Sequence, residues 1–273
     1  MTRRNKERLG LAAKIIIGLI YAIPVIMCLL FSIQPNTEIN KIPNHLIAEH
    51  PTLENYVYIL QNIPVINYLK NTLIMILIEV PAQIVIASIS AFVFAFFDFP
   101  GKNLIFTVYL TTMMVPGETT LIAKFMMIRN MGLMNTYLGL TIVSLVGAGS
   151  IFMLRQNMMS LPRELWEASV IDGCSEMKYF WRVVLPLCKP LIASQAITSF
   201  IGTFNSYIWP MMVSTKDDFY TIQVGMAQLI GEAFYGYGYI LAGAVLCMFI
   251  PLTIYIIAQR QIVAGMTAGA VKS

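Results

Sequence analysis

Few side chains in this sequence could take part in chemistry, and the first candidate is an acid inside an apolar run. Glu118 follows Pro116 and Gly117 about halfway along residues 104–128. If this run crosses a membrane, a charge at its centre costs about 2.5–3.5 kcal/mol even on the mildest insertion scale. Proline and glycine also free backbone carbonyls, which is tolerated where a helix lines a cavity or packs on protein. We therefore expect Glu118 to line a polar path, with a hydrogen-bonded acid inside a helix bundle as the alternative.

A second group combines hydrogen-bond donors with aromatic rings near the end of another apolar run. It consists of Asn205, Tyr207 and Trp209. Such side chains can stack on the apolar face of a sugar ring and bond its hydroxyl groups. Tryptophan and tyrosine near the end of a span more often anchor it at the membrane interface, which is the competing interpretation. A second intramembrane acid, Glu79, lies nearer the outer end of its run, and we expect it to have a structural role.

The motifs of common enzyme sites are missing from the sequence. It lacks G-x-x-x-x-G-K-[ST], H-E-x-x-H and G-x-S-x-G, and the Gly101-Lys102 pair is followed by asparagine. The two histidines, His45 and His50, have no third ligand at a recognisable spacing, and the four cysteines show no metal-ligand spacing. The net charge of +4 is small and dispersed, which disfavours nucleic-acid binding. We therefore expect a chain that is not an enzyme and holds neither a metal nor a cofactor.

The composition indicates a membrane protein built only of helices. Hydrophobic residues make up 58% of the 273 positions and charged residues 12%, with a mean hydropathy of +0.72. A soluble domain of this length needs more charge to cover its surface. A helix needs about 20 residues to cross the hydrocarbon core. Six segments meet this requirement and predict a single all-α transmembrane domain over residues 1–273: 11–33, 71–97, 104–128, 136–154, 185–213 and 239–257.

The placement of basic residues predicts the orientation of these spans. The first apolar run, 11–33, is longer than the ~7–15 residues of a signal peptide, so we expect it to be retained as a span. Lysine and arginine gather in the N-terminal segment and in the polar stretch that follows the fourth span. Because such residues favour the cytoplasmic side, both termini and the stretch 160–186 are predicted to be cytoplasmic, with residues 34–70 outside.

The stretch 160–186 is predicted to form two short helices joined by a sharp turn. Helix-tolerant residues run from Arg163 to Ile171, and Asp172-Gly173 supplies a stop because glycine takes the left-handed conformation cheaply. The second helix starts at Ser175 and has an apolar stripe at helical spacing: Met177, Phe180, Trp181 and Val184. Two interpretations remain open, namely an interfacial helix that rests on lipid headgroups and a docking element for a cytoplasmic partner.

Part of this stretch, "EASVIDGCSEMKYFWRVVLP", resembles the cytoplasmic "EAA…DGA…F…I.LP" loop of permease subunits in ATP-binding-cassette importers. Ser169 and Cys174 depart from the alanines of that motif but are also small. Similar segments, such as "YLKNTLIM", "FNSYIWPMMV" and "AGMTAGAVKS", extend the resemblance over most of the chain. They narrow it to the smaller six-span permease of carbohydrate-type importers, similar to those for maltose and glycerol-3-phosphate. The matching loop residues are Glu167, Ala168, Asp172, Gly173, Phe180, Leu185 and Pro186.

The resemblance implies half of a membrane pore for a sugar or sugar-like solute, in a prokaryotic inner membrane. The implied partners are a second homologous permease subunit in a heterodimer, two cytoplasmic P-loop ATPases that bind ATP and Mg²⁺, and an extracellular or periplasmic solute-binding protein. The tail 258–273 would reach the ATPases through Gly265, Thr267, Gly269, Ala270, Val271 and Lys272. An ion-coupled secondary transporter is the alternative, although it should show repeats with broken helices or a chain of proton-relay acids.

Overall fold

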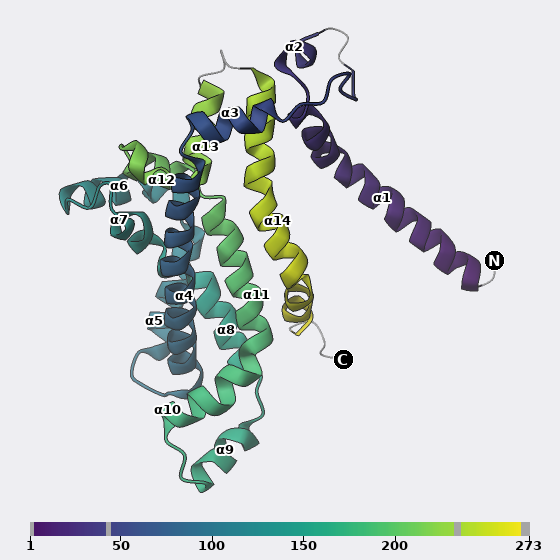
Figure 1. Cartoon of the computed structure of the whole chain (residues 1–273). Coiled ribbons are helices and arrows are strands. Elements are labelled where there is room, and N and C mark those ends of the chain that lie inside the picture. Colours follow the sequence, from purple (N-terminus) through teal and green to yellow (C-terminus); the bar gives the residue numbers. More distant parts are fainter. Residues whose placement is uncertain (1–2, 42–44, 232–235, 269–273) are drawn as a thin grey trace. The chain divides into compact units, whose positions relative to one another are not determined.

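The computed structural model describes residues 3–41, 45–231 and 236–268 (Figure 1). For residues 3–9, 230, 231, 258 and 260–268 it describes the backbone only. Every regular element among these residues is a helix and none is a strand, which confirms the predicted all-α class. The chain divides into two compact units. One comprises residues 1–66 and 225–250, and the other comprises residues 67–224 and 251–273.

The first unit holds α1 (Arg3–Ser32), α2 (Asn36–Ile39), α3 (Glu54–Asn62), most of α13 (Ile222–Gly231) and the first part of α14 (Tyr237–Ala268). Asn55 is buried and donates from its amide to the carbonyls of Ser32 and Gln34, both at 2.8 Å. These bonds hold the end of α1 against α3. The rings of Tyr58 and Tyr239 stack with centroids 4.1 Å apart, which joins α3 to α14.

The second unit is arranged around the long helix α4 (Val65–Phe96). The helices α5 (Lys102–Thr111), α8 (Ala148–Met159) and α11 (Leu185–Phe204) lie beside it (Figure 1). At one end of α4 lie α6 (Leu121–Asn130), α7 (Tyr137–Thr141) and α12 (Ile208–Val213), and at the other lie α9 (Arg163–Ile171) and α10 (Glu176–Tyr179). Each end has its own apolar core. One is built around Leu140 and Val213, and the other around Leu154 and Val184.

Polar side chains fasten the segment after α12 to the first half of α4. The amide of Asn71 donates to the carbonyls of Asp218 and Tyr220 at 2.7 and 2.9 Å. Tyr137 donates its hydroxyl to the Asn71 amide oxygen at 2.7 Å, and the backbone N–H of Ile222 donates to Thr72 at 2.8 Å. These bonds satisfy backbone groups that helical bonds leave unpaired, and they hold the segment on either side of its single 3₁₀ turn, η5 (Asp217–Phe219).

Several of the six predicted spans differ from the helices that the structure contains. Among the described residues, four helices are long and apolar enough to cross a membrane: Gly10–Ser32, Val65–Phe96, Glu176–Phe204 and Tyr237–Ile257. A fifth candidate is the pair Tyr137–Ser144 and Ala148–Met159, bent by 49° at a short break. Length and composition alone define these candidates.

The predicted third span, 104–128, is not one helix. α5 is followed by the 3₁₀ turns η1 (Thr112–Met114) and η2 (Gly117–Thr120) before α6 begins. Val115 is extended, with ψ 117°, because the proline that follows it disfavours the helical conformation and lacks an N–H.

The predicted fifth span, 185–213, is also interrupted, because α11 ends at Phe204 and the short α12 begins only at Ile208. Asn205, with φ −86° and ψ 1°, caps α11, and Tyr207 precedes α12. Leu185, the first residue of the predicted span, is also the first residue of α11. α11 is nevertheless continuous with the turn before it, so the candidate span already starts at Glu176.

Candidate functional site

The helix α9 begins and ends where local sequence signals place its limits. Pro162, with φ −58° and ψ 133°, precedes the first turn, and Glu164 in that turn suits the positive end of the helix dipole. At the other end Gly173 has φ +65°, a region that favours glycine. The N–H of Gly173 bonds the carbonyl of Val170 at 3.0 Å, and the N–H of Cys174 bonds that of Ser169 at 2.9 Å. This pair of bonds is a Schellman motif, which fixes the direction of the chain after α9.

The second helix starts at Ser175, whose hydroxyl accepts a bond from the N–H of Lys178 at 3.4 Å. α10 then passes into the π-helical turn η4 (Phe180–Val184) and on into α11. The predicted apolar stripe is partly wrong. Phe180 and Val184 are buried, but Met177 and Trp181 are 59% and 57% exposed. The buried face is instead completed by Tyr179, because a π turn adds a residue per turn and rotates the side chains away from α-helical spacing.

An aromatic cluster fixes both short helices to the end of α4. Trp166 of α9 meets Tyr179 of α10 edge to face, with ring centroids 4.9 Å apart. Phe96 of α4 contacts both rings, at centroid distances of 5.9 and 5.6 Å. Phe92 lies one turn back along α4 and contacts Phe180 at 4.9 Å. Three helices therefore share one set of rings, so α9 and α10 are not free to move independently of α4.

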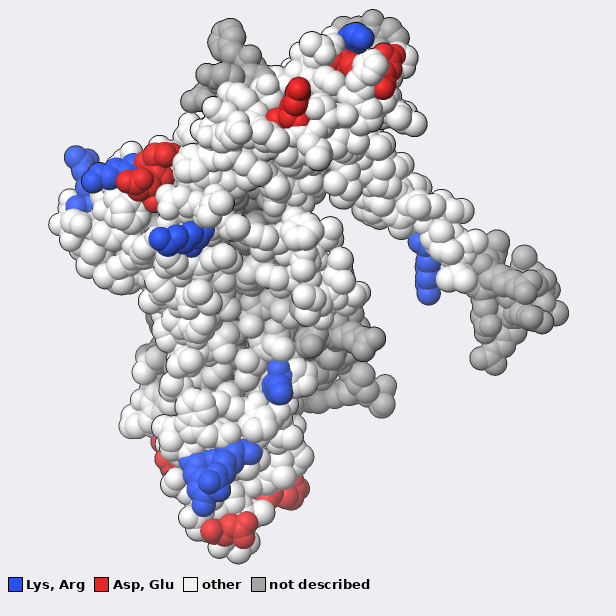
Figure 2. Space-filling view, in the orientation of Figure 1, with Lys and Arg blue, Asp and Glu red and all other residues white. Residues whose placement is uncertain are grey.

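The outer face of α9 carries apolar and acidic side chains that are exposed. Ile171 is 85% exposed and Val170 is 56% exposed. Glu167 and Asp172 are exposed beside them, and so is Ala168. The lower end of the molecule in Figure 2 shows acidic groups next to a patch of basic ones. Ser169 faces the other way and is buried, with its hydroxyl bonded to the carbonyl of Trp166 at 2.7 Å.

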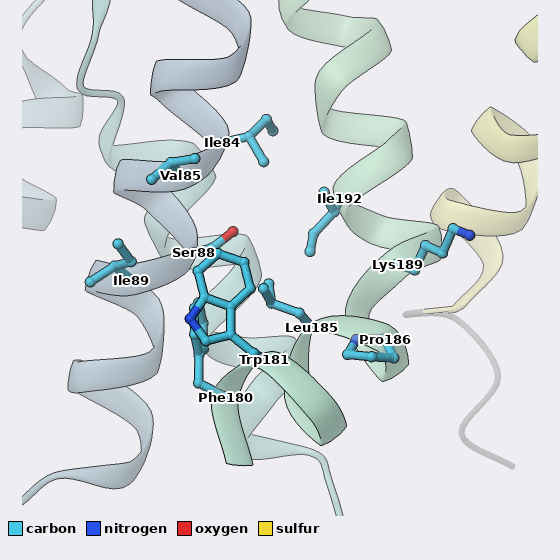
Figure 3. Close-up of a pocket in the computed structure, with 10 residues that line it drawn as sticks. All are labelled: Ile84, Val85, Ser88, Ile89, Phe180, Trp181, Leu185, Pro186, Lys189 and Ile192. Carbon is cyan, nitrogen blue, oxygen red and sulfur yellow. The ribbon is translucent and has the colours of Figure 1, made fainter. Parts of the chain in front are cut away.

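A groove with a volume of about 350 Å³ lies between α4 and the start of α11. Leu185 and Pro186 line its α11 side with Lys189, and Trp181 projects into it from η4 (Figure 3). Ser88 on α4 is one of the few polar groups in this groove. Two residues of the predicted loop motif therefore begin α11 and shape its contact with α4.

The polar residues predicted to line a path fall into two places. Asn205 and Tyr207 lie in the break between α11 and α12, and both are exposed. Trp209 is buried at 8% exposure and donates its indole N–H to the carbonyl of Leu140 at 3.0 Å. Glu118 is exposed on η2. Within the described ranges no hydrogen bond joins Glu118 to the other three, so the structure brings together only the residues near α12.

Glu79, for which the sequence predicted a structural role, belongs to a polar cluster around the middle of α4 whose other members the sequence did not reveal. Glu79 is 2% exposed, with the hydroxyls of Ser144 and Thr203 beside its carboxylate, and its Oε2 atom has no hydrogen-bond partner among the described residues. Gln83, one turn along, donates to the carbonyl of Ser144 at 2.7 Å. That carbonyl is freed by the break before α8, so Gln83 replaces a lost helical bond. The spacing of Glu79 and Gln83, four residues apart in an apolar helix, was the signal available in the sequence.

The predicted contacts of the C-terminal tail remain predictions. Gly265 and Thr267 lie in α14, where the structure describes only the backbone. Gly269, Ala270, Val271 and Lys272 lie outside the described residues.

The fold and the site define a class of protein, a polytopic α-helical membrane protein with several apolar helices and a short helical element held at the end of one of them. The chain belongs to the family described as "Binding-protein-dependent transport system inner membrane component", which it matches over residues 51–267. It is therefore an inner-membrane transport component and not an enzyme. The family gives no support to the alternative of an ion-coupled secondary transporter.

Relatives and a solved structure cover most of the chain. It is 30% identical over 259 residues to the arabinooligosaccharides transport system permease protein AraQ of Halalkalibacterium halodurans, covering 94% of this chain and 93% of the relative. It is 31% identical over 200 residues to the sn-glycerol-3-phosphate transport system permease protein UgpE of Yersinia enterocolitica. This match covers 72% of this chain and 71% of the relative. A chain in the crystal structure of a bacterial ABC transporter involved in the import of the acidic polysaccharide alginate shares the fold, with a TM-score of 0.81 at 18% identity. The match covers 95% of this chain and 98% of that chain.

Proposed function

We propose that this chain is a permease subunit of an ATP-driven ABC importer for a sugar or sugar-like solute, in which it forms half of the pore. The family and the carbohydrate permeases among its relatives support this function. The observation that carries the proposal is the α9–α10 element, which is fastened to α4 by aromatic rings while its outer face is exposed. A pore subunit driven by a separate motor needs such an element, because force must pass from the motor to the membrane helices.

The proposed topology has six crossings, with both termini in the cytoplasm. The four long helices and the bent pair α7–α8 supply five of them. The remaining crossing runs through α5 and α6, with the turns η1 and η2 between them. Broken helices are tolerated in a membrane where the freed backbone is buried in protein or lines a water-filled cavity. The basic residues near α9 and α10 support the proposal that this end of α4 is on the cytoplasmic side.

In the proposed mechanism a cytoplasmic ATPase binds the outer face of α9. Val170 and Ile171 supply apolar contact, and Glu167 and Asp172 pair with basic groups at the rim. Closure of the ATPases on ATP then displaces α9. Because Trp166 and Tyr179 bind α9 and α10 to Phe96, the displacement is passed to α4 and α11, which alternates access to the pore.

The proposed assembly contains a second homologous permease, two P-loop ATPases that hold ATP and Mg²⁺, and a solute-binding protein outside the membrane. The family description names dependence on a binding protein. The tail after α14 contacts the ATPases in this proposal, and the chain itself binds no cofactor. Glu118, Asn205 and Tyr207 are proposed to face the solute path. Trp209 contributes by holding α12 in place, since its ring is buried and bonded to Leu140.

The experiment that tests this function is purification of the tagged chain from native membranes in mild detergent, followed by mass spectrometry of its partners. We expect a P-loop ATPase, a second permease and a binding protein in fixed ratio, and ATP hydrolysis that the solute-loaded binding protein stimulates. A chain that purifies alone and transports a solute on an ion gradient in vesicles would contradict the proposal.

A further inference from the structure

One carboxylate joins two stretches of the segment between α1 and α3. Glu38, in the short helix α2, accepts a hydrogen bond from the backbone N–H of Glu49 at 3.0 Å and another from the N–H of His50 at 3.1 Å. One bond goes to each carboxylate oxygen. Residues that are distant in the sequence are therefore brought back beside α2, and each carboxylate oxygen still has a lone pair available.

This arrangement places three groups that bind metals next to one another. One ligand atom each from Glu38, Glu49 and His50 lies within 4.8 Å of the other two. A tetrahedral zinc ion with bonds of about 2.0 Å needs ligand atoms about 3.3 Å apart. The side chains of Glu49 and His50 are exposed, so rotation about their side-chain bonds can close this difference without moving the backbone. The sequence offered no third ligand for the histidines, and the fold supplies two carboxylates.

A second and independent observation points to a ligand at the same place. Gln34 is 1% exposed and donates from its amide nitrogen to the carbonyl of His45 at 2.8 Å. Its amide oxygen is buried and has no hydrogen-bond partner among the described residues. Gln34 lines a cavity of about 10 Å³ together with Glu38 and Glu49. A buried amide oxygen without a partner is costly, and a metal-bound water or the metal itself would satisfy it.

We infer that Glu38, Glu49 and His50 form a binding site for a divalent transition-metal ion of the zinc type. One imidazole and two carboxylates suit zinc better than calcium, which prefers six or more oxygen ligands. Gln34 orients the water on the open coordination position. The inference rests on the first compact unit alone and is independent of the proposed transport function.

Two further side chains lie at the edge of the site. Lys41 lines the same cavity, and its positive charge opposes a bound cation. The imidazole of His45 lies 3.9 Å from the carboxylate of Glu49.

The test is a Zn²⁺ titration of the full chain in nanodiscs, together with whatever subunits copurify with it. The tag must not be polyhistidine, and the cysteine thiols are blocked by alkylation because they would also bind zinc. Bound metal is counted by elemental mass spectrometry after removal of the loosely held ions. We expect one equivalent of zinc, and Glu49→Gln or His50→Ala should weaken its binding at least about tenfold. Lys41→Met should tighten it.

Glu54→Gln is the matched control, since it removes an acid of the same unit that is no part of the cluster. It should leave zinc binding unchanged, and all variants should elute as the parent chain does. The inference is overturned if the parent chain binds no zinc at micromolar concentrations, or if Glu49→Gln and His50→Ala bind it as tightly as the parent. It is likewise overturned if calcium displaces the zinc.

Discussion

Trp166 of α9 and Tyr179 of α10 lie on opposite sides of the Gly173 turn and meet edge to face, with ring planes at 78° and centroids 4.9 Å apart. Tyr179 is fully buried, and both rings also contact Phe96 of α4. This pair closes the short loop between the two helices and joins it to a membrane helix. The tip of α9 therefore cannot move far without moving α4.

The first prediction concerns the aromatic contact at Tyr179. Tyr179→Ala should cost about 3–5 kcal/mol, because it leaves a cavity among large rings. Tyr179→Phe is the matched control. The hydroxyl is buried without a hydrogen-bond partner in the described chain, so its removal should be neutral or slightly stabilising. Thermal unfolding of the solubilised complex measures both, and equal losses for the two variants would contradict the role given to the ring.

The second prediction concerns the turn between the helices. Gly173 has φ +65°, which proline cannot adopt and which costs a residue with a side chain about 1–2 kcal/mol. Gly173→Pro and Gly173→Trp should abolish solute-stimulated ATP hydrolysis while the complex still inserts. The strain comes from the backbone, because no atom lies within 4 Å of the added Cβ position.

Gly173→Asn serves as the control for this turn, since asparagine tolerates the left-handed region better than most residues. It should retain most of the stimulated activity. Retention of coupling in Gly173→Pro as well would show that the geometry of the turn does not transmit force.

The third prediction concerns Gly139, where α7 approaches another part of the chain closely. A Cβ at this position would lie 2.1 Å from the carbonyl oxygen of Leu133, which is a backbone atom and cannot move aside easily. Gly139→Ala should therefore destabilise the protein by more than about 2 kcal/mol. Gly202→Ala, in α11, meets no atom within 4 Å and should gain up to about 1 kcal/mol from better helix propensity. The melting temperatures of the two variants should move in opposite directions.

The fourth prediction separates two aromatic residues at the start of α12. Tyr207 is 40% exposed, so Tyr207→Ala should lower the initial rate of solute uptake and leave the melting temperature nearly unchanged. Trp209 is buried and bonded to Leu140, so Trp209→Ala should destabilise the fold by about 3–5 kcal/mol. If Tyr207→Ala transports at the parental rate, Tyr207 is not part of the solute path.

Local signals in the sequence were sufficient to predict α9, the helix that is proposed to contact the ATPase. The predicted helix from Arg163 to Ile171 matches α9 residue for residue, because Pro162 and Gly173 determine its ends without help from distant parts of the chain. The stripe predicted for the next helix assumed α-helical spacing and failed at Trp181, since the π turn depends on packing of Tyr179 and Phe180 against α4.

Features that arise from distant contacts could not be read from the sequence. The break after Phe204 depends on how Trp209 is buried against Leu140, although both segments read as one apolar run. The partners of Glu79 come from two other segments, near residues 144 and 203. Glu38 and His50 are brought together by a hydrogen bond between segments without a periodic pattern, for which periodicity offers no guide.

The most direct measurement is photo-crosslinking from Ile171, which is 85% exposed at the tip of α9, in native membranes that contain the whole assembly. A crosslinker at this position should join the chain to an ATPase subunit. The same crosslinker at Ile20 of α1, which is 58% exposed on an apolar helix, is the control for adducts formed with lipid. Adducts of Ile171 with an ATP-binding polypeptide are the predicted result. Adducts with lipid alone, as expected from Ile20, would contradict the account.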